Sequence, residues 1–150
     1  MRAFAQYATV LLALAAIALA GTQTADQLKA RADAAHGGEQ AKLCLEYARQ
    51  ELEDSNALFT QGDVDKAQAQ IQEVVVYSRK AADAASASGR QLKETEIKLR
   101  KLSERMHDIA ATLAFEDREP VHQAIEQIEQ IRSDLMVRMW GPQAAPKGKS

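Results

Sequence analysis

The chain has 150 residues, of which 46% are hydrophobic and 27% charged, and its formal net charge is −2. Glycine, proline and aromatic residues are scarce, which favours helices over strands. A slightly acidic chain lacks the positive field that binding to nucleic acid or to an anionic membrane requires, so we expect neither partner.

The first 20 residues have the pattern of a secretory signal peptide. Arg2 supplies a positive start, residues 10–20 are all apolar, and Ala18-Leu19-Ala20 is a small-x-small cleavage pattern. We therefore expect cleavage after Ala20, a location in the periplasm or outside the cell, and no membrane contact of the mature protein. The alternative is an uncleaved anchor that tethers the chain to a membrane, although the apolar run is short for a span.

Residues 21–38 are polar and rich in alanine. We expect a flexible or weakly helical segment here, which Gly37 and Gly38 separate from a helical domain at 39–140. A first firm helix is predicted from about Glu39 to Thr60, because small and apolar residues recur on one face at spacings of three and four. The residues of this face are Ala41, Leu45, Ala48, Leu52, Ser55 and Phe59.

Cys44 is the single cysteine, so it cannot form a disulfide within the chain. Its apolar neighbours predict a small buried side chain on the first helix. The alternative is a disulfide between two copies of the chain, because an unpaired cysteine in an exported protein can link two molecules.

The turn after the first helix is predicted at Gly62, which suits a left-handed helix end, with Asp63 as the cap of the next helix. The run Leu58-Phe59-Thr60-Gln61-Gly62-Asp63-Val64-Asp65-Lys66-Ala67 resembles the turn inside a tetratricopeptide repeat, where a small alanine follows a Gly-Asp turn. The resemblance covers about residues 44–77 and has no second copy at a period of about 34 residues. It implies one helical hairpin of a kind that cradles peptide segments of partner proteins.

From Val64 to Leu113, a seam of mostly apolar or small residues alternates spacings of three and four without a slip, which is typical of coiled-coil-like packing. The predicted fold is therefore all-α and built from antiparallel helical hairpins. Either a long central helix spans about 63–115, or it breaks near 86–89 and gives a four-helix up-down bundle. The unbroken spacing and the absence of proline favour the continuous helix.

Glu116 to Pro120 is predicted to form the next turn, with Asp117 as the cap of a last helix that ends near Trp140. We expect Trp140 to cover the end of the bundle and residues 141–150 to form a disordered basic tail. Acidic residues predominate in 39–60 and 116–140, whereas basic residues predominate in 90–105. A basic helix flanked by acidic ones indicates internal charge complementarity, and the alternative is a basic face for an acidic partner.

Two Glu-x-x-His pairs are the most suggestive metal pattern, since residues three apart share one helix face and can hold a metal ion together. The pairs are Glu104 with His107 and Glu119 with His122. Neither Glu104 nor His107 lies on the predicted seam, and the two pairs fall at different levels along the bundle. We therefore predict surface side chains and no metal site.

The sequence predicts no catalytic or cofactor-binding residue. Met106 is the only seam residue able to bind haem iron, and the methionines are better explained as core residues. Cys44 and the serines have no evident histidine and carboxylate partners. The expected function is that of an exported, non-enzymatic protein that acts through helix–helix contacts, as an adaptor or an oligomer. The alternatives are a ligand- or metal-binding bundle and, if the signal is retained, a membrane-tethered scaffold.

Overall fold

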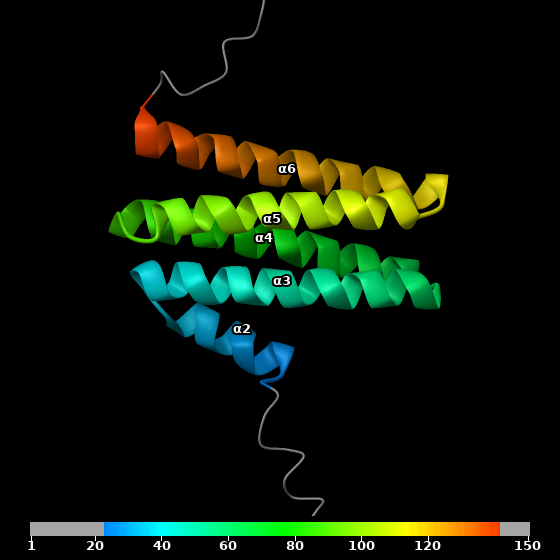
Figure 1. Cartoon of the computed structure of the whole chain (residues 1–150). Coiled ribbons are helices and arrows are strands. Elements are labelled where there is room, and N and C mark those ends of the chain that lie inside the picture. Colours follow the sequence, from blue (N-terminus) through cyan, green and yellow to red (C-terminus); the bar gives the residue numbers. More distant parts are fainter. Residues whose placement is uncertain (1–22, 142–150) are drawn as a thin grey trace, which may run out of the picture.

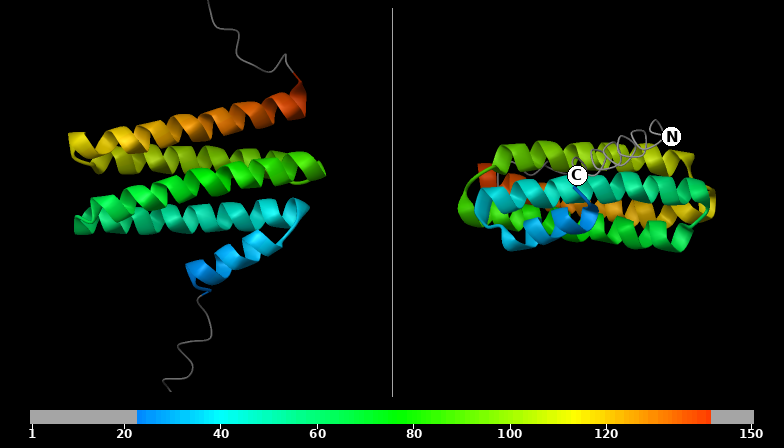
Figure 2. Two further views of the ribbon diagram at one scale, coloured as in Figure 1. Left: turned by 180° about the vertical axis from the view of Figure 1, so that it is seen from behind. Right: turned by 90° about the horizontal axis from the view of Figure 1, so that it is seen from below.

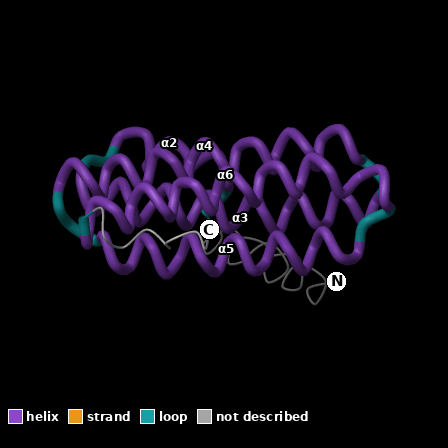
Figure 3. Tube along the Cα trace, turned by 90° about the horizontal axis from the view of Figure 1, so that it is seen from above, coloured by secondary structure: helices purple, strands orange, loops and turns teal. Residues whose placement is uncertain are grey.

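The computed structural model describes residues 23–141, so the predicted signal peptide and the tail after Gly141 lie outside the described part. This part is all-α, as predicted, and contains no strand. Its five helices are α2 (Ala25–Ala34), α3 (Gly37–Gln61), α4 (Val64–Ser88), α5 (Leu92–Thr112) and α6 (Phe115–Trp140). Helices α3 to α6 lie roughly along one direction, whereas α2 slants away from them (Figure 1), and the connections gather at the two ends of the molecule (Figure 3).

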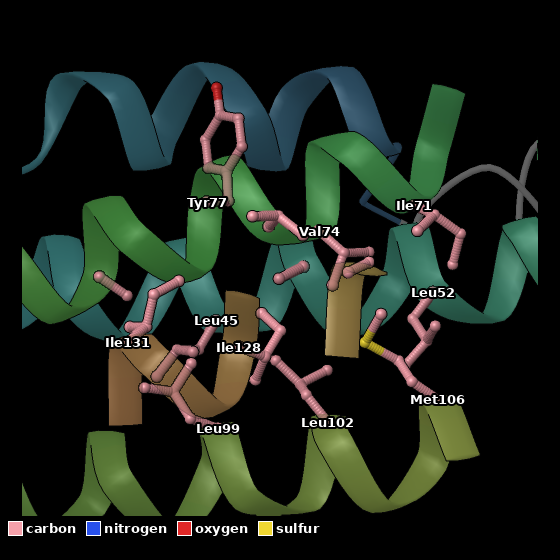
Figure 4. Packing of buried hydrophobic residues seen from close by; sticks show 14 of the residues in the cluster. Leu45, Leu52, Ile71, Val74, Tyr77, Leu99, Leu102, Met106, Ile128 and Ile131 are labelled. Carbon is pink, nitrogen blue, oxygen red and sulfur yellow. The ribbon is translucent and has the colours of Figure 1, made fainter. Parts of the chain in front are cut away.

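Helices α3 and α4 form the closest pair in the molecule and α5 and α6 form a second hairpin. The two hairpins stack with α4 against α6 and α3 against α5, while α3 and α6 are not neighbours. Consecutive helices run in opposite directions, so α3 and α5 are parallel. The four helices enclose one core, in which leucine, isoleucine and methionine side chains from all four interdigitate (Figure 4).

The prediction of a continuous central helix is wrong, because the helix breaks at Gly89 to Gln91. Gly89 ends α4 with φ 66°, and Gln91 has φ 64° although it is not a glycine. Two left-handed residues in three reverse the chain, so the second half of the seam folds back and shares the core of the first half. Ending a helix at a glycine costs little free energy compared with the stabilisation from the apolar area that this closure buries.

The small residues before this break allow α3 to begin close to it. Ala41 of α3 packs against Ala84 and Ala85 of α4. A Cβ atom on Gly38 would lie 3.1 Å from the Cγ atom of Gln91, so a side chain there would crowd the connection. The alanine-rich end of α4 therefore serves close helix approach, which is why large seam residues are missing there.

The turn between the first helix and the next is as predicted. Gly62 ends α3 with φ 81°, in the left-handed region. Asp63 precedes α4, but its carboxylate pairs with Lys66 at 2.8 Å instead of capping the helix.

The predicted turn at Glu116 to Pro120 is placed too late. The chain reverses at Leu113 and Ala114, and α6 already begins at Phe115, so Pro120 lies inside the helix. Proline has no backbone N–H, so the carbonyl oxygen of Glu116, four residues earlier, lacks its helical donor. The side chain of Arg118 secures this corner by donating to the carbonyl oxygen of Leu113 at 2.9 Å.

Helix α2 lies where a flexible or weakly helical segment was expected. It packs against α3 on the side of the molecule away from α6 (Figure 2). Thr24 and Gln27 form a capping box, in which each side chain accepts a hydrogen bond from the other's backbone N–H. Leu28 and Ala32, four residues apart, are buried against the bundle. The predicted break before the first firm helix is present but lies at Ala35 and His36, and Gly37 and Gly38 begin α3.

Candidate functional site

A cleft of about 440 Å³ runs between the parallel helices α3 and α5. Here α3 and α5 pack much less closely than the two helices within either hairpin. Side chains from three turns of α3 and two turns of α5 form its walls and floor. The lining residues are Lys42, Leu45, Glu46, Arg49, Leu52, Glu53, Lys98, Lys101, Leu102 and Arg105.

The floor of this cleft, which we call the α3–α5 groove, is apolar. Leu52 is 0% exposed and Leu45 and Leu102 are 3% and 5% exposed, so the floor is narrow and most of the apolar surface of the groove lies on its walls. The same leucines point toward the bundle interior in Figure 4. The walls are the hydrocarbon stems of lysine and arginine side chains, which are apolar up to their charged ends.

One ion pair lies at the end of the groove nearest the C-termini of α3 and α5. The guanidinium of Arg105 donates to both carboxylate oxygens of Glu53, at 2.8 and 2.9 Å. This two-pronged pairing holds the pKa of Glu53 below its ordinary value. Lys98 is paired within α5, at 3.0 Å from Glu94.

Three other basic side chains of the groove have no carboxylate partner among the described residues. Within residues 23–141, Lys42, Arg49 and Lys101 have no carboxylate oxygen within 4.0 Å of their charged nitrogen atoms, and all three are exposed. Lys42 and Arg49 are seven residues apart, so they lie two turns apart on one face of α3, and Lys101 lies on the α5 wall. The groove therefore has unpaired positive charge on both walls.

Among the described residues, the predicted pairing of the basic segment with acidic neighbours is present at Arg105, which pairs with Glu53 of α3. Toward α6 the sense is reversed, because Glu96 of α5 accepts from Arg132 of α6 at 2.6 Å in a largely buried pair. Sequence reasoning did not identify Lys42 and Arg49, because both lie on a helix whose overall charge is acidic. Their spacing of seven residues was the available signal.

A second polar cluster fixes α2 to the α3–α4 hairpin. Tyr77 of α4 turns away from the main core toward α2 (Figure 4) and donates to Asp33 at 2.9 Å, while Lys80 pairs with the same carboxylate. The rings of Tyr47 and Tyr77 meet edge-on at 4.5 Å, and the ammonium of Lys29 lies 5.5 Å from the centre of the Tyr77 ring. These contacts make α2 a docked part of the structure.

Glu51 is the one buried carboxylate beside this cluster. Its residue is 6% exposed, and burial raises the pKa of its carboxyl group, with the nearby charges of Asp54 and Glu73 acting in the same direction. The charged form is therefore costly to keep in the folded protein. Lys29, which pairs with Glu73 at 3.1 Å, offsets part of this cost.

Cys44 is buried, as predicted, in the same apolar cluster as Leu28 and Ala32 of α2. Burial raises the pKa of its thiol to about 11, so the thiol stays protonated and unreactive at neutral pH. A disulfide between two copies would require this side chain to become exposed first.

The residues weighed as metal ligands are exposed. Glu104 and His107 lie on the outside of α5, and Glu119 and His122 lie on the outside of α6. Across residues 23–141, no group of three or more His, Cys, Asp or Glu side chains is arranged to hold a metal ion. Met106 is fully buried as a core residue.

A second cavity, of about 540 Å³, lies at the end of the bundle where α3 begins and α4 ends. It brings His36 and Glu39 near Ser88, a combination that resembles parts of a hydrolytic site. The Ser88 hydroxyl donates to the carbonyl oxygen of Ala84 at 2.8 Å, so its proton is already committed to the helix backbone. Trp140 does not cover the bundle end as expected, because it is 68% exposed.

None of helices α2 to α6 is both long and apolar enough to cross a membrane. In comparisons with known proteins, no protein-family model, curated protein or solved structure matches this chain.

Proposed function

We propose that this chain is an exported, non-enzymatic interaction protein that acts through helix–helix contacts, with the α3–α5 groove as its docking surface. The observation that carries the proposal is the groove itself, which joins a narrow apolar floor to a rim of unpaired cations. Surface features of this composition are typical of sites where a protein segment docks, because the stems supply apolar contact and the charges supply specificity.

Two features of the sequence support the same function. The N-terminal pattern ending in Ala18-Leu19-Ala20 supports export. The turn at Gly62, which resembles that of a tetratricopeptide repeat, supports a role in binding segments of other proteins. A non-enzymatic role is supported by the burial and raised pKa of Cys44, the chain's only thiol.

Native mass spectrometry of the protein from the exported fraction of its own host tests this function. We expect the wild-type chain to start at Gly21 and to carry a second chain, either another copy or a different protein. The triple variant Lys42→Glu, Arg49→Glu, Lys101→Glu should lose that second chain.

A matched control changes the net charge equally outside the groove. Arg90→Glu, Lys93→Glu, Arg138→Glu also reverses three exposed cations that have no carboxylate within 4.0 Å in the described part of the chain. This variant should keep the second chain. A bare wild-type monomer, or a complex that survives the groove substitutions, would contradict the proposed docking surface.

A further inference from the structure

The unpaired cations of the groove set the chemistry of what binds there. Lys42 and Arg49 lie on the α3 wall and Lys101 on the α5 wall, so an occupant meets positive charge on both sides of an apolar strip. The remaining basic residues, Lys98 and Arg105, are already paired with carboxylates of this chain. Carboxylates are the natural partners of the three free cations, since lysine and arginine pair with them by charge-assisted hydrogen bonds.

We propose that the groove binds an amphipathic helix of a different protein, with a narrow apolar face against the floor and acidic side chains on both flanks. The proposal rests on the proposed function and names its partner class. The two cations of α3 are one heptad apart, so they match two acidic residues at i and i+7 of a helix that lies along the groove. The acidic residue on the opposite flank pairs with Lys101.

The groove also contains features that select against other partners. Glu46 lies among the cations and, within the described residues, has no lysine or arginine nitrogen within 4.0 Å, so it repels a uniformly negative ligand such as a nucleic acid strand. No aromatic side chain lines the groove to stack on a base. A helix with discrete acidic positions avoids this carboxylate, whereas a continuous phosphate backbone does not.

A second copy of the chain fits the groove poorly. Its acidic helix, α6, has the right charge, but the apolar side of α6 is buried in its own bundle through Val121, Ile125 and Ile128. Between its two ends the outer face that remains is polar, with glutamate and glutamine at Glu119, Gln123, Glu126, Gln127 and Gln130. The exposed apolar side chains of α6, Phe115 and Trp140, lie at opposite ends of the helix and form no stripe. The apolar stripe that the floor requires must therefore come from another protein.

Two designed peptides provide the direct test. Both are helices of three heptads with the same leucine stripe, and they differ only in carrying glutamate or lysine at the flanking positions. Each is labelled with a fluorophore and titrated with the purified chain while anisotropy is recorded. We expect the acid-flanked peptide to bind at least about tenfold more tightly than the lysine-flanked one, since several rim pairs each contribute a few-fold. The difference should shrink at high salt, because exposed charges are screened.

The variants described above locate the binding. Lys42→Glu, Arg49→Glu, Lys101→Glu should weaken the acid-flanked peptide by about tenfold or more, and the control Arg90→Glu, Lys93→Glu, Arg138→Glu by less than about twofold. Helix content and unfolding midpoint by circular dichroism confirm that both triple variants are folded. If a triple variant is not folded, Lys101→Glu alone replaces it, with an expected loss of about threefold.

The outcomes separate this inference from the function on which it rests. Equal binding of the two peptides, or undiminished binding by the groove variant, would overturn the acidic-helix partner. A native complex that depends on the groove but contains only two copies of this chain would also overturn it, while leaving a docking function in place. A wild-type chain without any groove-dependent complex would remove the function itself.

Discussion

The connection between α4 and α5 offers a test in which the two architectures predict opposite signs. Gly89 has φ 66°, and a Cβ atom added there would meet nothing within 4 Å. The cost of Gly89→Ala is therefore only that of holding an L-residue in the left-handed region, about 1–2 kcal/mol. Alanine also lowers the conformational entropy of the unfolded chain, and this smaller, stabilising effect opposes part of that cost. The bundle thus predicts a net destabilisation of about 1 kcal/mol.

A continuous helix across the same residues predicts the reverse. Glycine inside a helix is about 1 kcal/mol less favourable than alanine, so Gly89→Ala would then stabilise the protein. Gln91 gives the complementary substitution, because it adopts φ 64° without being a glycine. In the bundle, Gln91→Gly relieves the left-handed strain and should stabilise by about 0.5 kcal/mol after the entropy of glycine is counted. In a continuous helix it should destabilise.

Urea unfolding followed by circular dichroism measures both changes, provided that the slope with denaturant stays constant. Gly62→Ala is the matched control, since Gly62 has φ 81° and equally open surroundings, and both architectures predict that it destabilises. For a domain of this size, 1 kcal/mol corresponds to a shift in Tm of about 4 °C. A higher midpoint for Gly89→Ala together with a lower one for Gln91→Gly would refute the broken helix.

Four further predictions concern the core and the contact of α2. Leu52→Ala empties a fully buried site and should cost about 2–5 kcal/mol in urea unfolding, with a result below about 1 kcal/mol contradicting its place in the core. Tyr77→Phe removes the hydrogen bond to Asp33 and should cost about 1 kcal/mol, with faster amide exchange confined to α2. The Lys80 ammonium and the Tyr77 hydroxyl hold the pKa of Asp33 below its unfolded value, so docking of α2 should be complete above about pH 4 and weaken as pH falls through the folded pKa. Asp33→Asn should accordingly speed alkylation of Cys44 at pH 7.5, and an unchanged rate would show that α2 does not protect the thiol. The pKa of Glu51 is raised, so its effect on stability has the opposite pH dependence: the ionised carboxylate destabilises the folded protein at neutral pH. Glu51→Gln should therefore raise the unfolding midpoint at pH 7. This gain should disappear as pH falls toward about 4, where the wild-type carboxyl group is protonated.

Periodicity accounts for most of what the sequence predicted about this fold. Most of the predicted seam from Val64 to Leu113 is buried, and so is the stripe from Ala41 to Ser55. The exceptions are Phe59, Val64 and Leu92, which are partly buried, and Ser88, which is exposed. This success is physical, because a helix face repeats every three or four residues whatever its partner. Gly62 was equally predictable, since a left-handed helix end is a local property of glycine.

The break at Gly89 to Gln91 was not decided by local properties. The heptad spacing continues through it, and one glycine changes the helix energy by only about 1 kcal/mol. What selects the break is the closure of a single core between two hairpins, an interaction between residues far apart in the chain. Helix α2 is a different case, because its signals were present in the capping box of Thr24 and Gln27 and in the spacing of Leu28 and Ala32.

The α3–α5 groove, the proposed docking surface, could not be identified from the sign of a helix's net charge. From the sequence, 90–105 was the basic segment, and its charges were expected to meet acidic neighbours or an acidic partner. Arg105 pairs with Glu53 of α3, whereas Lys101 has no carboxylate partner among the described residues. The difference depends on which helix lies beside which face of α5, and that order is set by the stacking of the two hairpins. Only then do Lys42 and Arg49, two cations of an acidic helix, come to face Lys101 across an apolar strip. The cations that define the proposed docking surface are thus those that folding leaves without a carboxylate partner among the described residues.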